Sequence, residues 1–114
     1  MSKDLTLLAD DALTRIDSIQ ADVEGISFDD FLRDTLVRDA VCYRLLVIGE
    51  VVKRIMELGS LSDNEEYWRS IIDFRNVIAH QYDEIELQMV WDIIQSELSG
   101  LRRQLLRLSE QAEE

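Results

Sequence analysis

The sequence predicts an all-α fold, and its apolar pattern is the first reason. Apolar residues recur at steps of three and four along almost the whole chain, which is the spacing of helices that bury one face. The second reason is turn chemistry, because the 114 residues contain four glycines and no proline. Aromatic residues make up 7% of the chain, which also leaves little for a β fold. This length and a hydrophobic content of 46% predict one domain, residues 1–114, with a modest core.

The first predicted helix runs from about Asp4 to Glu24, and Gly25 predicts its end, since glycine readily takes the left-handed conformation that closes helices. Its apolar residues form one stripe on an acidic rod: Leu5, Leu8, Ala12, Ile16, Ile19 and Val23. The segment Ser27-x-x-Asp30 then resembles a capping box, with aspartate in place of the usual glutamate. It predicts a short helix from about Phe28 to Asp34, whose buried side should contain Phe28, Phe31 and Leu32.

The helix predicted from Thr35 to Leu58 is apolar on more than one side. Such a helix is buried by more than one neighbour, and around Leu45–Val52 we expect one neighbour to be a second subunit. Gly49 lies in its middle at a cost of about 1 kcal/mol relative to alanine, which the close approach of another helix would explain. Glu50 has two interpretations: it is an orienting acid for a site, or an exposed acid paired with Lys53 or Arg54.

A second capping signal, Ser62-x-x-Glu65, precedes a helix that is expected to form by Trp68 and to end near His80. We expect Arg69 on this helix to form a surface salt bridge. The alternative is that it adds positive charge near a functional site. The last helix is expected from about Glu86 to Gln111, with a bend at Gly100. Three basic residues near its end have two interpretations, contact with RNA or stabilisation of the helix dipole: Arg102, Arg103 and Arg107.

The stretch from Phe74 to Tyr82 contains the residues best suited to chemistry. It holds the only histidine of the chain, His80, with Arg75 five positions earlier and Tyr82 two positions later. On a helix that turns about 100° per residue, Asn76 and His80 share a face, whereas Arg75 and His80 lie roughly 140° apart. Arg75 and His80 can therefore meet one phosphate only if the helix loosens before His80, or if a second copy of the chain supplies half of the site.

Metal-free cleavage of RNA needs a base to take the proton of the 2′-hydroxyl and a cation to stabilise the phosphorane. Imidazole titrates near neutral pH, so His80 suits the first role. Guanidinium binds phosphate through two parallel hydrogen bonds and stays charged, so Arg75 suits the second. Asn76 could hold the imidazole ring or bind a phosphate oxygen, and Tyr82 could stack on a base or donate a hydrogen bond. An isolated arginine and histidine near a helix end are more often structural, so the motif needs support from the rest of the chain.

That support comes from a resemblance. The motif Arg75-x-x-x-x-His80-x-Tyr82, with Asn76 after the arginine, resembles the signature of HepT-type toxins in the HEPN ribonuclease superfamily. Four further blocks resemble the family in the same order, and the whole covers about residues 5 to 110: Ser27-Phe28-Asp29-Asp30-Phe31-Leu32, Asp39-Ala40-Val41, Ile48-Gly49-Glu50-Val51-Val52-Lys53-Arg54 and Trp68-Arg69-Ser70-Ile71-Ile72. The chain departs from the family pattern at Gln81, and the turn after Tyr82 has no glycine.

The resemblance implies an HEPN-type helical bundle with four main helices plus one or two short helices. It also implies a homodimeric, metal-independent endoribonuclease that cleaves mRNA or tRNA as the toxin of a toxin–antitoxin system. The implied catalytic residues are Arg75 and His80, with support from Asn76, Tyr82 and Glu50. In that family the antitoxin is a minimal nucleotidyltransferase, which is thought to silence the toxin by AMPylation of the motif tyrosine, here Tyr82.

The charge of the chain favours a different class of function. The net charge of −12 argues against broad attraction to nucleic acid. Residues 1–40 carry ten acids and four bases, residues 41–80 six and five, and residues 81–114 eight and three, so the motif lies in the least acidic third. An acidic surface suits a basic protein partner. The alternative function is therefore a non-catalytic helical interaction module that binds the nucleotidyltransferase.

Several classes of site and location are disfavoured by what the sequence lacks. The single cysteine, Cys42, cannot form an internal disulfide, and its apolar neighbours predict a packing role. One cysteine and one histidine cannot build a tetrahedral zinc site, and we expect no metal and no cofactor. No apolar run approaches the ~18 residues of a membrane span and no signal peptide opens the chain, so the cytoplasm is the default location.

Overall fold

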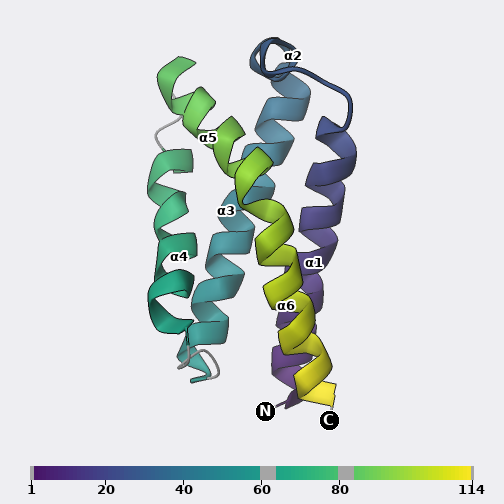
Figure 1. Ribbon diagram of the computed structural model, residues 1–114, viewed down its shortest axis with the longest axis vertical. Coiled ribbons are helices and arrows are strands. Elements are labelled where there is room, and N and C mark those ends of the chain that lie inside the picture. Colours follow the sequence, from purple (N-terminus) through teal and green to yellow (C-terminus); the bar gives the residue numbers. More distant parts are fainter. Residues whose placement is uncertain (1, 60–63, 80–83, 114) are drawn as a thin grey trace.

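The predicted all-α fold is confirmed. The computed structural model describes residues 2–59, 64–79 and 84–113, and within them it contains six helices and no strand. The longer helices lie side by side along the bundle, with both termini at one end and the short helix α2 at the other (Figure 1). The helices are α1 (Ser2–Val23), α2 (Phe28–Arg33), α3 (Thr35–Glu57), α4 (Glu65–Ala79), α5 (Glu84–Ser96) and α6 (Leu98–Glu113).

The core lies where α1 packs against both α3 and α6, and it extends through α3 to α4. The expected stripe of α1 faces this core, because Ala12, Ile16 and Ile19 are fully buried. Cys42 of α3 is also buried here, and this desolvation, with the nearby charge of Asp39 as a smaller cause, raises the pKa of its thiol to about 11. The thiol is thus protonated at neutral pH, which agrees with the predicted packing role.

The helix ends follow the local signals of the sequence. Gly25 and Gly59, with φ of 76° and 77°, take the left-handed conformation just beyond α1 and α3. The capping box before α2 forms in both directions: the Asp30 amide donates to Ser27 Oγ at 3.1 Å, and the Ser27 amide donates to Asp30 Oδ2 at 3.0 Å. The hydrogen bond from the Ser27 backbone lowers the pKa of the Asp30 carboxyl.

Asp34 caps the next helix, α3, because its side chain accepts from the Val37 amide at 3.1 Å. Ser62 of the second capping signal lies outside the described residues.

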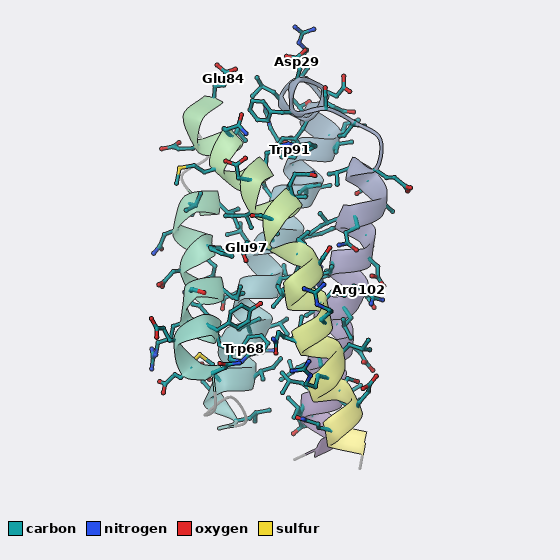
Figure 2. The ribbon with its side chains drawn as sticks, in the orientation of Figure 1. Asp29, Trp68, Glu84, Trp91, Glu97 and Arg102 are labelled. Carbon is teal, nitrogen blue, oxygen red and sulfur yellow. The ribbon has the colours of Figure 1, made fainter. Side chains whose placement is uncertain are left out.

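The short helix α2 closes one end of the bundle through aromatic contacts. Phe31 is fully buried, and its ring centroid lies 5.2 Å from that of Trp91 in α5. Phe28 packs on the same indole at 6.3 Å, and Figure 2 places Trp91 at this end of the molecule. These contacts bury the predicted apolar side of α2.

The last predicted helix is divided, and the expected bend at Gly100 is wrong by three residues. The division lies at Glu97, between α5 and α6, although two helical hydrogen bonds still span it: Glu97 N to Ile93 O at 2.9 Å and Leu101 N to Glu97 O at 3.0 Å. Ser96 Oγ donates to Asp92 O at 2.6 Å, a side-chain bond of the kind that bends helices. The division lets α5 pack on α4 and α2, while α6 packs on α1.

Neighbours within the same chain account for most of the apolar surface of α3. Leu45, Ile48, Val51 and Val52 are buried, and α3 packs against α1, α2 and α4. The apolar residues around Leu45–Val52 therefore need no second subunit to explain them. Two large hydrophobic side chains of α3 remain exposed, Leu36 at 84% and Tyr43 at 62%. None of the described helices is long and apolar enough to cross a membrane.

Candidate functional site

Arg75 lies in α4, one turn before that helix ends at Ala79. Its side chain is 29% exposed and reaches the neighbouring helix α3, where Nη1 donates to Oε1 of Glu50. α3 and α4 run next to each other in Figure 1, so the pair bridges two packed helices. The guanidinium of the proposed phosphate-binding residue is thus held at the junction of α3 and α4.

Gly49 provides the room for this side chain. A Cβ added at Gly49 would lie 2.5 Å from Cγ and 2.8 Å from Cδ of Arg75, which is closer than real Cβ atoms approach other heavy atoms. The expected close approach to Gly49 is therefore present, but an arginine side chain makes it. A glycine amid an apolar helical run was the only sequence signal for this contact, and nothing in the spacing of the residues pointed to Arg75.

Glu50 is exposed, as one of its two interpretations predicts, but its partner is not the predicted one. Its carboxylate pairs with Arg75 of α4, and no ion pair with Lys53 or Arg54 occurs among the residues described. Glu50 itself is 58% exposed, so the pair lies at the surface of the α3–α4 junction. A carboxylate in this position fixes the orientation of the guanidinium.

The other residues of the predicted site differ in how far the structure describes them. Asn76 follows Arg75 on α4 and is exposed. His80, Gln81 and Tyr82 lie outside the described residues, so the angle between Arg75 and His80 stays a prediction. The structure therefore brings together Arg75 and Glu50, which lie 25 residues apart in the chain.

The remaining arginines singled out in the sequence include clear structural pairs. Arg69 binds Glu65 one turn earlier, with Nη2 2.6 Å from Oε1, as the salt-bridge interpretation predicts. Arg102 of α6 lies beside α1 (Figure 2), and its Nε donates to Asp17 Oδ1 at 2.8 Å. The hydrogen bond and the charge of Asp17 raise the pKa of Arg102. Arg103 and Arg107 are exposed on the same helix. Of the three basic residues near the end of the last helix, Arg102 thus links two helices.

Comparisons with known proteins agree with the resemblance of the motif. The family model described as ribonuclease HepT-like matches residues 9–108. A protein of Caldanaerobacter subterraneus named "Putative RNase" is 30% identical over 83 residues, 73% of this chain and 74% of that protein. A protein of Methanocaldococcus jannaschii with the same description is 30% identical over 92 residues, 81% of this chain and 76% of that protein.

A further relative from Methanocaldococcus jannaschii is named "Gamma-glutamylcyclotransferase and putative RNase". It is 23% identical over 111 residues, 97% of this chain, and this chain spans 50% of its length. No solved structure matched the chain. The family match covers most of the sequence and includes the α3–α4 junction with Arg75, Gly49 and Glu50. The chain belongs to the HepT-like ribonuclease family.

Proposed function

We propose that this chain is an endoribonuclease that cleaves mRNA or tRNA without a metal ion. The observation that carries the proposal is the position of Arg75, whose guanidinium is held at the α3–α4 junction five residues before the only histidine. Membership of a ribonuclease family supports the same reaction. Because an arginine stays charged at all relevant pH values, it can bind a phosphate in every protonation state of the histidine.

The proposed reaction uses the RNA itself as the source of the nucleophile. His80 takes the proton of the 2′-hydroxyl, and the 2′-oxygen then attacks the adjacent phosphorus. Arg75 stabilises the negative charge that accumulates on the phosphoryl oxygens of the phosphorane. The bond to the 5′-oxygen breaks, and that oxygen takes up a proton. The expected products are a 2′,3′-cyclic phosphate and a free 5′-hydroxyl.

Asn76, Glu50 and Tyr82 have supporting roles in this proposal. Asn76 is exposed next to Arg75, where its amide is accessible to the imidazole ring or to a phosphate oxygen. Glu50 holds the guanidinium from the opposite helix. Tyr82 is the proposed site of AMPylation and a candidate stacking surface for a base.

The exposed face of α3 supports a homodimer. Leu36, Tyr43 and Glu50 are spaced by seven residues, and two helical turns bring such residues back to nearly the same face, with a drift of about 20°. The two exposed hydrophobic side chains therefore lie in line with the carboxylate that binds Arg75. A second copy that covers Leu36 and Tyr43 would lie next to the Arg75–Glu50 pair. Such a dimer would bring two copies of the motif to one cleft.

The toxin–antitoxin role rests on the family resemblance and on the charge of the chain. We propose that a minimal nucleotidyltransferase silences this ribonuclease by transferring AMP from ATP to Tyr82. The net charge of −12 suits a partner with a basic surface. The same charge favours the second candidate function, an interaction module that binds the nucleotidyltransferase and cuts no RNA.

Incubation of the purified chain with total RNA, with and without EDTA, separates these functions. The ribonuclease is expected to cut RNA equally in both conditions and to leave cyclic phosphate ends. An interaction module would leave the RNA intact while still binding the nucleotidyltransferase. Activity that disappears with EDTA and returns with added divalent cations would contradict the metal-independent reaction.

A further inference from the structure

Toward the described part of the chain, Arg75 uses only one nitrogen of its guanidinium for hydrogen bonding. Nη1 donates to Glu50, and toward residues 2–59, 64–79 and 84–113 its Nε and Nη2 make no hydrogen bond. Nε and Nη2 form one edge of the planar guanidinium, and such an edge binds two oxygens of one phosphate through parallel hydrogen bonds. Glu50 therefore occupies a nitrogen that a phosphate bound to this edge does not need.

The aliphatic part of the Arg75 side chain lies over the backbone of α3 at Gly49. The contact involves Cγ and Cδ, in the middle of the side chain, and α4 fixes the backbone from which they extend. Gly49 also lines a small cavity together with Phe74 and Ile78 of α4, so it lies at the interface of the two helices. A methyl group at position 49 would therefore displace the side chain of Arg75 and, with it, the guanidinium.

We propose that Gly49 and Glu50 are positioning residues for Arg75. Gly49 provides the space over which the side chain crosses α3, and Glu50 binds Nη1 so that the Nε–Nη2 edge is left for the scissile phosphate of RNA. This inference rests on the proposed function, because it assigns the phosphate to Arg75. It adds a steric requirement at a residue that has no functional group of its own.

The contact itself is tested by stability, independently of any activity. Four chains are compared by urea unfolding: wild type, Gly49→Ala, Arg75→Ala and the double variant. Alanine is the better helix former, so Gly49→Ala should raise the unfolding midpoint in the Arg75→Ala background, where the side chain that opposes the methyl group is absent. In the wild-type background the same substitution should leave the midpoint unchanged or lower it. Equal shifts in the two backgrounds would overturn the inference.

The positioning role is tested by the kinetics of RNA cleavage. A displaced guanidinium loses its interaction with the transition state, so Gly49→Ala should lower kcat by about 10²-fold with little change in KM. Glu50→Ala should also lower kcat, and Glu50→Gln should retain more activity because its amide oxygen can still accept from Nη1. A loss confined to KM would overturn the role, since a positioning residue acts on the reacting geometry.

Gly100 of α6 offers a matched control. A Cβ there would meet Arg103 Nη2 at 3.6 Å, an ordinary van der Waals distance. Gly100→Ala adds the same methyl group to a helix and should cleave RNA at the wild-type rate. If wild type and Gly100→Ala cut RNA and Gly49→Ala cuts equally well, the positioning role falls while the ribonuclease stands. If wild type cuts no RNA, the proposed function and the positioning role both fall.

Discussion

Among the described residues, three arginine–carboxylate pairs link neighbouring helices: Arg44–Asp22, Arg75–Glu50 and Arg102–Asp17. The last two differ in their surroundings. Arg102 of α6 binds Asp17 of α1, with side chains that are 40% and 53% exposed. Arg75 of α4 binds Glu50 of α3, with side chains that are 29% and 58% exposed. The similar exposure predicts a small contribution to stability from each pair, about 0–1 kcal/mol.

The difference lies in the helix that each arginine reaches. α1 contains no glycine, and Arg102 reaches Asp17 without one. α3 has a glycine in its middle, directly under Arg75, where alanine would stabilise the helix by about 1 kcal/mol if the arginine side chain were absent. The glycine is better explained by the space that the Arg75 side chain needs than by the strength of the Arg75–Glu50 ion pair. The comparison therefore supports the proposed role of the Arg75–Glu50 pair and gives the Arg102–Asp17 pair a structural role.

The largest expected effect is on catalysis at the α3–α4 junction. Arg75→Ala and His80→Ala should each lower the rate of RNA cleavage by about 10³-fold and remove growth inhibition, because each removes a group that acts in the transition state. Circular dichroism should show that both variants stay helical. Arg102→Ala is the control and should cut RNA normally. A folded Arg75→Ala protein that cuts RNA at the wild-type rate would remove this arginine from the mechanism.

The second prediction concerns control of the same site at Tyr82. AMP attached there would add a charged phosphodiester and a bulky base two residues after His80, and its phosphate could bind Arg75. Tyr82→Phe keeps the ring and removes the acceptor oxygen, so it should escape AMPylation and keep at least part of the ribonuclease activity. Mass spectrometry after incubation with the nucleotidyltransferase and ATP measures the added AMP. A mass gain that persists in Tyr82→Phe would place the modification on another residue.

The third prediction concerns the core on the α1 side. Ile16 is fully buried, and Ile16→Ala should lower the free energy of unfolding by about 2–5 kcal/mol through lost burial and a new cavity. Urea unfolding measures this loss. Protein that remains folded should cut RNA at the wild-type rate, since Ile16 lies in α1, whereas Arg75 and Glu50 lie in α4 and α3. A large loss of kcat in fully folded Ile16→Ala would show that the two regions are coupled.

The fourth prediction concerns the exposed face of α3. Wild type should sediment as two chains at micromolar concentration, and Tyr43→Glu should shift it toward one chain, because a charge would be buried in the dimer. Leu7→Glu is a matched control, since Leu7 is a similarly exposed hydrophobic residue (60%) on α1. The ribonuclease activity of Tyr43→Glu should fall with the dimer. A monomeric wild type with full activity would exclude a site shared between subunits.

The smallest expected effect is at the structural pair. Arg102→Ala should lower the free energy of unfolding by about 0–1 kcal/mol, because an exposed ion pair gains little over its interactions with water. Urea unfolding at low and high salt measures the contribution and its screening. A loss of several kcal/mol would mean that this pair holds α6 to α1, and the distinction between the two pairs would then rest on activity alone.

The success of the sequence-based predictions depends on how local each interaction is. The end of α1 at Gly25 and the capping box of Ser27 and Asp30 involve residues at most three positions apart, and both predictions are confirmed. The last helix was predicted as one helix with a bend at Gly100, but it is divided at Glu97. A glycine marks where a helix can bend, whereas the position of the division also depends on which neighbours α5 and α6 pack against.

The sequence by itself determined the positions of α1 to α4, the capping box of α2 and the family motif, because these follow from apolar spacing and from contacts within one helical turn. It also named Arg75 and Glu50 as candidates. Only the tertiary structure decided that Glu50 binds Arg75 and that Gly49 accommodates the Arg75 side chain. These residues lie 25 and 26 positions from Arg75 on a different helix, and their contact depends on how α3 and α4 pack. The periodicity of one helix fixes which face is apolar, but it does not fix which residue of the next helix lies opposite.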